Sequence, residues 1–212
     1  MNKDELKKSF LKSLGQELSP KGYQTFVTDQ TLVKKLPEAH HMIHAGFIVH
    51  PQDINVTVDV GIRLPNVEKF VDEIQNERSS RFSFTIGVDV GHLTVGKRLR
   101  WTLVNETDIP QAVENIRSVL TQVDTLFFDR FPTSQSIFEM LSRNDSTTEL
   151  LSPLALKRAI RTIVLAYLLN GREALDEAIQ SKTIYMTSKG GPQISDFNEF
   201  CEKMMAKVSG TQ

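Results

Sequence analysis

Hydrophobic and polar residues alternate along several stretches of the chain, and this period of two predicts β-strands. The cleanest stretch covers residues 56–64, where valine, isoleucine and leucine take every second position. Residues 43–49 show the same pattern, and the short link after Pro51 makes the two strands antiparallel neighbours. We expect the other strands at residues 23–36, as a hairpin turning at 28–30, at residues 82–90 and at residues 98–103.

A period of about 3.6 residues predicts helices before, between and after these strands. Leu6, Phe10 and Leu14 lie four residues apart in the first helix. Asn66, Ser152 and Ser195 stand where the pattern predicts N-caps, and Gly171 where it predicts a helix end. The expected helices cover residues 4–18, 67–77, 109–127, 134–142, 156–170 and 173–181, with a last one after residue 195.

The order of these elements indicates the α+β class, with an antiparallel sheet of about five strands and helices on one face. Residues 144–148 form the most linker-like polar run of the chain. We therefore expect an α+β sheet domain at residues 1–145, followed by an all-helical C-terminal extension at residues 150–212.

Composition narrows the functional classes. The 212 residues are 40% hydrophobic and 24% charged, which is typical of a packed globular protein rather than a disordered or fibrous one. The net charge of -1 argues against a positive electrostatic field over the whole protein, which would attract nucleic acid. The single cysteine, Cys201, cannot form an internal disulfide. It lies on the apolar face of the last predicted helix, so we expect its side chain to be buried. Since no secretory signal or membrane-spanning stretch is visible, we expect a cytoplasmic protein without membrane association or cofactor.

The tetrapeptide Val-Asp-Val-Gly occurs twice, and it places Asp59 and Asp89 on the polar faces of two predicted strands. If the strands are neighbours, the two carboxylates can share a proton or bind a hard cation. Together with His92 they would serve a metal- or nucleotide-dependent enzyme. The alternative interpretation is two solvent-facing aspartates in valine-rich strands, which we favour.

Residues 86–94 resemble the first phosphate-binding motif of the actin, hexokinase and Hsp70 ATPase superfamily, in which an Asp-x-Gly turn joins two strands of a hairpin. The resemblance implies that Asp89 addresses metal-bound water. It departs at His92, which replaces the hydroxyl residue expected after Gly91, and no second phosphate motif follows.

Histidines, basic residues and aromatic residues form three further groups. On a strand, His44 and His50 lie about 20 Å apart, so we expect no zinc site among residues 40, 41, 44 and 50. Trp101 stands beside a basic region, and such a region can bind nucleic acid. We favour the alternative that these side chains are solvated and protect an edge strand of the sheet. The aromatic corner at residues 127–131 and Trp101 form our candidate binding patch, with the outer face of the sheet as the alternative surface, although aromatic residues at such a corner more often belong to the core. The residues concerned are Arg78, Arg81, Lys97, Arg98 and Arg100 in the basic region, and Phe127, Phe128 and Phe131 in the corner.

Over residues 1–142 the chain resembles bacterial domain-of-unknown-function proteins of toxin-immunity type. The resemblance rests on the opening helix with Leu6, Phe10 and Leu14, the Lys21-Gly22-Tyr23 entry into the first strand, residues 56–64, and the late helix ending in the aromatic corner. It implies a monomeric or dimeric protein that binds another protein. The element order is also similar to type III secretion chaperones, which are small dimers. We therefore expect a non-enzymatic protein-binding module, immunity-like or antitoxin-like, with a chaperone-like homodimer or an enzyme as alternatives.

Overall fold

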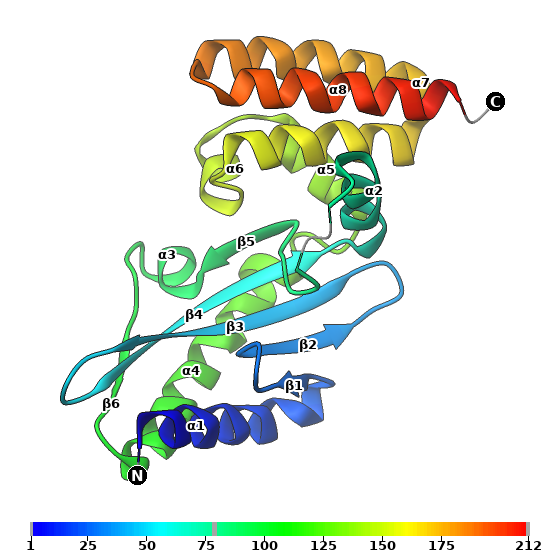
Figure 1. Ribbon diagram of the computed structural model, residues 1–212. Helices are drawn as coiled ribbons and strands as arrows, with labels where there is room; N and C mark the ends of the chain where they lie inside the picture. Colours follow the sequence, from blue (N-terminus) through cyan, green and yellow to red (C-terminus); the bar gives the residue numbers. More distant parts are fainter. Residues whose placement is uncertain (1, 78–79, 211–212) are drawn as a thin grey trace. The chain divides into compact units, whose positions relative to one another are not determined.

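The computed structural model describes residues 2–77 and 80–210 and confirms the α+β class (Figure 1). The chain folds into two compact units. The sheet unit contains the residues up to Arg63 together with Gly87–Pro132. The helical unit contains Leu64–Ile86 and the residues from Thr133 onward. The predicted domains, residues 1–145 and 150–212, divide the chain differently, because residues 64–86 and 133–145 group here with the C-terminal helices.

The sheet is antiparallel, as predicted, and its main path runs in the order β1-β2-β3-β4-β5, while β6 pairs with β4. In the long pair, His44 of β3 lies opposite Asp59 of β4, and Thr31 of β2 lies opposite His44. The strands are β1 Gln24–Phe26, β2 Thr31–Lys35, β3 His40–Val49, β4 Ile54–Arg63, β5 Ile86–Asp89 and β6 Trp101–Leu103.

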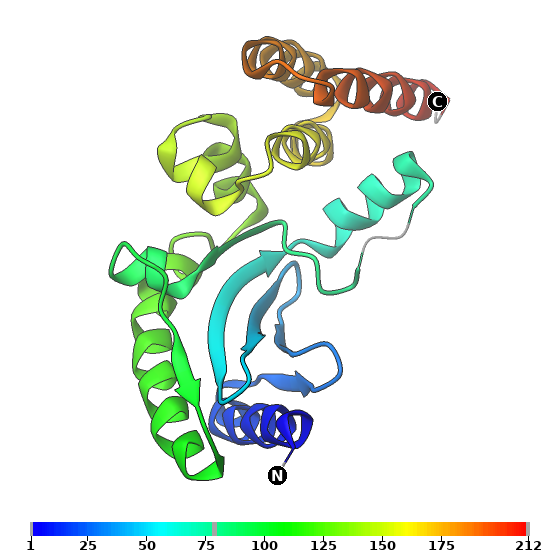
Figure 2. The same cartoon turned by 60° about the vertical axis from the view of Figure 1, so that its left-hand side comes forward.

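One face of the sheet is covered by helices α1 (Lys3–Leu18) and α4 (Ile109–Val123), which also pack on each other (Figure 2). The Phe10 ring meets the Phe47 ring of β3 edge-on, with the centroids 5.8 Å apart. Every second residue of β4, from Ile54 to Ile62, is fully buried, as the alternating pattern predicts. The opposite face carries the polar side chains of β4, including Asp59.

Three predicted boundaries in the sheet unit are wrong. The strand expected at residues 82–90 is reduced to β5, since residues 82–85 form turns and irregular backbone, and Asp89 ends the strand by capping the five-residue helix α3 (Val90–Thr94). The strand expected at 98–103 is reduced to β6. Helix α4 ends at Val123 and continues as one wider π turn, Asp124–Phe128. Two short 3-10 turns, Ser19–Lys21 and Glu106–Asp108, precede β1 and α4.

The helical unit contains α2 (Pro65–Gln75), α5 (Ser134–Ser142), α6 (Ser146–Leu151), α7 (Ala155–Lys189) and α8 (Gln193–Ser209). The backbone of α7 is broken at Gly171, whose φ of 79° lies in the left-handed region, so the predicted helix end there is confirmed. The second segment, however, continues to Lys189 instead of ending near residue 181. The polar run at 144–148 is wrong as a linker, because Asp145 accepts a hydrogen bond from the Thr148 amide and caps α6.

The predicted N-caps are also shifted. Helix α2 follows Leu64 with proline in its first turn, α7 follows Leu154, and α8 follows Pro192. In α2, Pro65 starts the helix without a side-chain cap because its fixed φ suits the first turn. No helix in the described ranges is both long and apolar enough to cross a membrane.

Candidate functional site

A polar row crosses the sheet face opposite α1 and α4, and consists of Thr31, His44, Asp59 and Asp89 from the adjacent strands β2 to β5. The Thr31 Oγ1 and His44 Nδ1 atoms are 3.1 Å apart. His44 faces Asp59 across the β3–β4 pair. The sheet therefore brings together the two aspartates that the sequence singled out, and adds a histidine.

Asp59 is the member of the row whose carboxylate has no hydrogen-bond partner in the described part of the chain. Its pKa is raised above 3.8, first by burial and then by the nearby Asp89 charge, while His44 and Arg98 act in the opposite direction. This is the behaviour of paired carboxylates in which one ionises less readily.

Asp89 has a structural role. Its Oδ1 atom accepts hydrogen bonds from the amides of Gly91 (2.8 Å) and His92 (3.2 Å), and its Oδ2 atom lies 3.5 Å from Arg98 Nε. The residue is only 7% exposed. The interpretation of Asp89 as a solvent-facing side chain is therefore wrong, because the carboxylate satisfies amides at the start of α3.

The resemblance of residues 86–94 to an ATPase phosphate motif is not matched by the backbone. Strand β5 leads into α3, whereas that motif joins two strands of a hairpin. The His92 side chain is exposed, and only its amide contacts Asp89. Gly91 is required by packing, since a Cβ atom there would lie 2.3 Å from the Lys97 carbonyl oxygen. That close approach holds the following loop over α3.

The aromatic corner is core, so the predicted binding patch is wrong for three of its four residues. Phe127, Phe128 and Phe131 are all 5% exposed or less. The π turn directs Phe127 and Phe128 inward, and His41 stacks on Phe128 at 4.1 Å. Burial and Lys34 lower the pKa of His41 to about 4, despite the opposing charges of Asp124 and Asp129.

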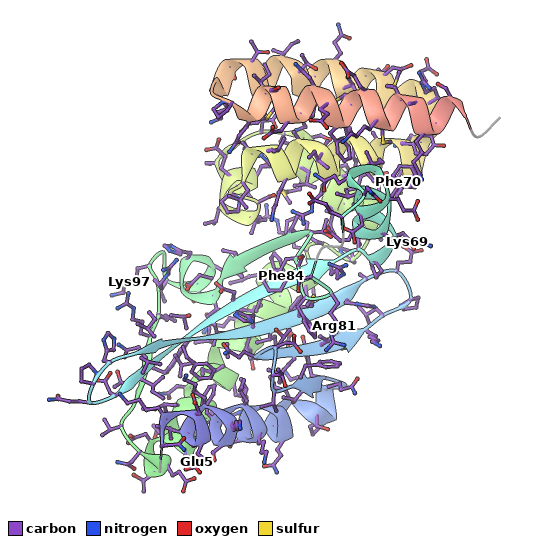
Figure 3. All side chains as sticks on the ribbon, viewed as in Figure 1. Glu5, Lys69, Phe70, Arg81, Phe84 and Lys97 are labelled. Carbon is purple, nitrogen blue, oxygen red and sulfur yellow. The ribbon has the colours of Figure 1, made fainter. Side chains whose placement is uncertain are left out.

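Trp101, the fourth residue of the predicted patch, lies on β6 opposite Val56 of β4 and is half-buried. The loop before it carries Lys97, Arg98 and Arg100, all exposed, and Figure 3 labels Lys97 there. In the part of the chain that the structure describes, Lys97 and Arg100 form no ion pair.

Two members of the predicted basic region lie elsewhere. Arg81 belongs to the helical unit, where its guanidinium lies over the Phe82 ring. Arg78 lies outside the described residues.

The histidines predicted to lie on a strand do so, since β3 contains His40, His41 and His44 and ends just before His50. Within residues 2–77 and 80–210, no three His, Cys, Asp or Glu side chains are grouped to hold a metal. Cys201 is buried in α8, and burial raises the pKa of its thiol to about 12.

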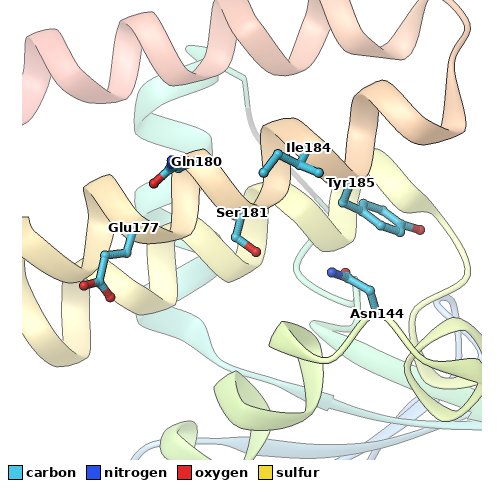
Figure 4. A pocket seen from close by; sticks show the side chains of 6 residues that line it. All are labelled: Asn144, Glu177, Gln180, Ser181, Ile184 and Tyr185. Carbon is cyan, nitrogen blue, oxygen red and sulfur yellow. The ribbon is translucent and has the colours of Figure 1, made fainter.

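A groove in the helical unit was not predicted. Its cavity volume is about 470 Å³, and one side is the outer face of α7 with Glu177, Ser181 and Ile184 (Figure 4). Asn144 and Tyr185 lie together at the other end from Glu177. The sequence pattern concealed it, because the helix was expected to end near residue 181 and Asn144 to lie in a linker. The lining residues are Asn144, Glu177, Gln180, Ser181, Ile184 and Tyr185.

Two buried cations lie behind the Asn144 end of this groove. Arg158 and Lys182 are each 1% exposed. Arg158 donates to the Ser152 carbonyl and the Tyr185 hydroxyl, and Lys182 donates to the Leu141 carbonyl (2.7 Å) and Asn144 Oδ1 (2.6 Å). Burial and the Arg158 charge lower the pKa of Lys182 to about 8.

The chain matches no family model, no curated protein and no solved structure.

Proposed function

We propose that this chain is a non-enzymatic protein-binding module that uses the β6 edge of its sheet unit to bind an acidic surface of a partner. The β6 edge is defined here as the loop and strand that carry the exposed Val95, Lys97, Arg98, Arg100 and Val104 and the half-buried Trp101. The observation that carries the proposal is the combination, on one short segment, of three exposed cations with exposed apolar side chains. Val95 and Val104 are 54% and 61% exposed.

Charge and apolar area have different roles in such a contact. Lys97 and Arg100, which form no ion pair with a described residue, attract an acidic surface and accelerate encounter. Apolar side chains supply the area that is removed from water once the partner is bound. The close approach of the loop to Gly91 and the Arg98–Asp89 ion pair restrict the conformation of the segment, which reduces the entropy lost on binding.

The engagement of Asp89 supports binding over catalysis, since a carboxylate that caps a helix and pairs with Arg98 is not a free base or metal ligand. The second candidate function is a metal- or nucleotide-dependent enzyme. It is favoured by one observation, the raised pKa of Asp59 beside Asp89.

Within the binding class, the sequence resemblance favours an immunity-like or antitoxin-like role in the cytoplasm, with a toxin as the acidic partner. A chaperone-like homodimer is the alternative. Neighbouring genes distinguish them, because a toxin gene favours the first and a secretion-effector gene the second.

The test uses the full chain and a displayed library of random 12-residue peptides. We expect the selected peptides to be acidic with apolar residues, and to bind at least about tenfold more weakly to the double variant Lys97→Glu/Arg100→Glu. The matched control, Lys8→Glu/Lys12→Glu, changes two exposed lysines of α1 by the same charge and should bind like wild type.

Selected peptides without an acidic bias, or equal binding to both variants, would overturn the proposal. A single-stranded oligonucleotide is measured in parallel. Tight oligonucleotide binding that is lost in the Lys97→Glu/Arg100→Glu variant would also overturn it, in favour of nucleic acid.

A further inference from the structure

The corner of the helical unit behind the groove holds more buried positive than negative charge. Arg158, Lys182 and Lys189 gather around Tyr185, within 5.6 Å of its ring centre. The carboxylate that pairs with this group is Glu149, which is half exposed, lies 3.8 Å from Arg158 and hydrogen-bonds Lys189. Buried cations with too little counter-charge are costly to the fold and attract an anion.

Arg158 is also incompletely satisfied. Its Nη atoms have partners, but its buried Nε atom has none among the described residues. The Tyr185 hydroxyl accepts from Arg158 and donates to Glu149, so it has no further proton to offer. Buried donors without acceptors are rare in native proteins and call for an explanation.

Asn144 connects the buried charge to the groove. An ammonium group only donates hydrogen bonds, so the Asn144 amide presents its carbonyl oxygen to Lys182. The NH₂ group of the same amide therefore points away from Lys182. Figure 4 shows the amide nitrogen on the groove side. The Asn144 backbone has a φ of 55°, in the left-handed region that is costly for most residues. Asp145, the next carboxylate, is engaged with the Thr148 amide.

The far end of the groove has the opposite character. The Glu177 carboxylate only accepts hydrogen bonds, while Gln180 and Ser181 both accept and donate. Ile184, which is 68% exposed, adds an apolar side chain between the two ends, and the Tyr185 ring adds apolar surface at the Asn144 end. Such a lining suits a carbon skeleton with hydroxyl groups, and 470 Å³ is within the range of small-molecule sites.

We propose that this groove binds an organic phosphate that bears hydroxyl groups, such as a sugar phosphate. The phosphate accepts hydrogen bonds from the Asn144 NH₂ group in the positive field of Lys182 and Arg158, and the hydroxyl groups point to Ser181, Gln180 and Glu177. The site lies in the helical unit and uses no residue of the β6 edge, so it stands or fails independently of protein binding.

Asn144→Asp is the decisive variant. The carboxylate keeps an acceptor for Lys182 and gives it a counter-charge, but it removes the NH₂ donor and repels an anion. We therefore expect a higher melting temperature together with at least about tenfold weaker binding of glucose 6-phosphate and of inorganic phosphate. The control Asn198→Asp adds the same charge at an exposed position of α8 and should leave binding unchanged.

A second variant tests the hydroxyl end. Glu177→Gln should weaken glucose 6-phosphate binding and leave inorganic phosphate binding unchanged. Isothermal titration of the full chain with glucose 6-phosphate, inorganic phosphate, glucose and succinate gives the affinities. The proposal is overturned if folded wild type binds no phosphate up to about 10 mM, if Asn144→Asp binds like wild type, or if glucose or succinate binds as tightly as glucose 6-phosphate.

Discussion

Glu68 and Arg161 form a buried bidentate ion pair, although 93 residues separate them in the sequence. The two nitrogen–oxygen distances are 2.8 and 2.9 Å, and the Thr85 hydroxyl donates to the same carboxylate at 2.7 Å. Thr85 also accepts from the Leu64 amide. The network joins α2 and the segment after it to α7, which explains why residues 64–86 group with the helical unit.

We expect Glu68→Ala to lower the free energy of unfolding by about 3 to 5 kcal/mol, because the variant leaves the Arg161 guanidinium buried without a counter-charge. Chemical denaturation measures the loss. The matched control on the same helix is Glu73→Ala, which removes an exposed carboxylate paired with Lys207 and should cost much less. Equal losses in the two variants would contradict a special role of the buried pair.

The cap at Asp89 makes a prediction that separates structure from chemistry. Asp89→Ala should lower the free energy of unfolding by about 1 to 2 kcal/mol, whereas Asp89→Asn should remain close to wild type, because asparagine also accepts hydrogen bonds at an N-cap. Thermal denaturation of the three proteins tests this. A large loss of stability in Asp89→Asn would show that its charge, through Arg98 or a bound cation, matters more than the cap.

Asp59 should decrease stability at neutral pH. Its pKa is raised in the folded state, so the folded protein binds the proton more tightly, and stability falls as the pH rises above 3.8. Asp59→Asn should therefore melt at a higher temperature than wild type at pH 7, and the difference should shrink below about pH 3.8. A lower melting temperature of Asp59→Asn at pH 7 would mean that the carboxylate has a favourable partner.

His41 should have the opposite pH dependence. Since its pKa is lowered to about 4, the unfolded chain takes up the proton first, and the protein loses stability as the pH falls from 6.5 toward 4. The full shift corresponds to about 3.4 kcal/mol, and solvent screening of the partly exposed ring makes the loss smaller than this. His41→Phe keeps a ring against Phe128 without a titrating group and should remove this part of the pH dependence. Denaturation midpoints at pH 4 to 7 measure it, and parallel curves for both proteins would contradict the prediction.

Local patterns were sufficient for most of the sheet. The alternation in residues 56–64 predicted β4 because every second side chain of a strand faces the core, and Ile54 to Ile62 follow that rule. The pattern failed at residues 82–85, where the chain forms turns and irregular backbone and Thr85 hydrogen-bonds Glu68 and the Leu64 amide. Periodicity contains no information on such hydrogen bonds, because they join residues that are distant in the sequence.

The candidate sites were predicted less well. Phe127 and Phe128 lie together in the sequence, but a π turn rather than continued α-helix decides which way they point. Asp59 and Asp89 were identified as a pair, whereas His44 was missed as their neighbour because its register depends on the β3–β4 pairing. The groove at Asn144 was missed because it is built from residues about 40 positions apart.

By itself, the sequence determined the class of fold, the antiparallel pairing of the two longest strands, the helix break at Gly171 and the burial of Cys201. Each of these follows from periodicity or from the conformational preference of one residue, which acts over a few neighbours. Only the tertiary structure decided which charges are buried and with whom, as for Arg161 with Glu68 and for Lys182 with Asn144. The physical reason is that desolvation and hydrogen bonding depend on distances between atoms, and the chain sets those distances only after it has folded.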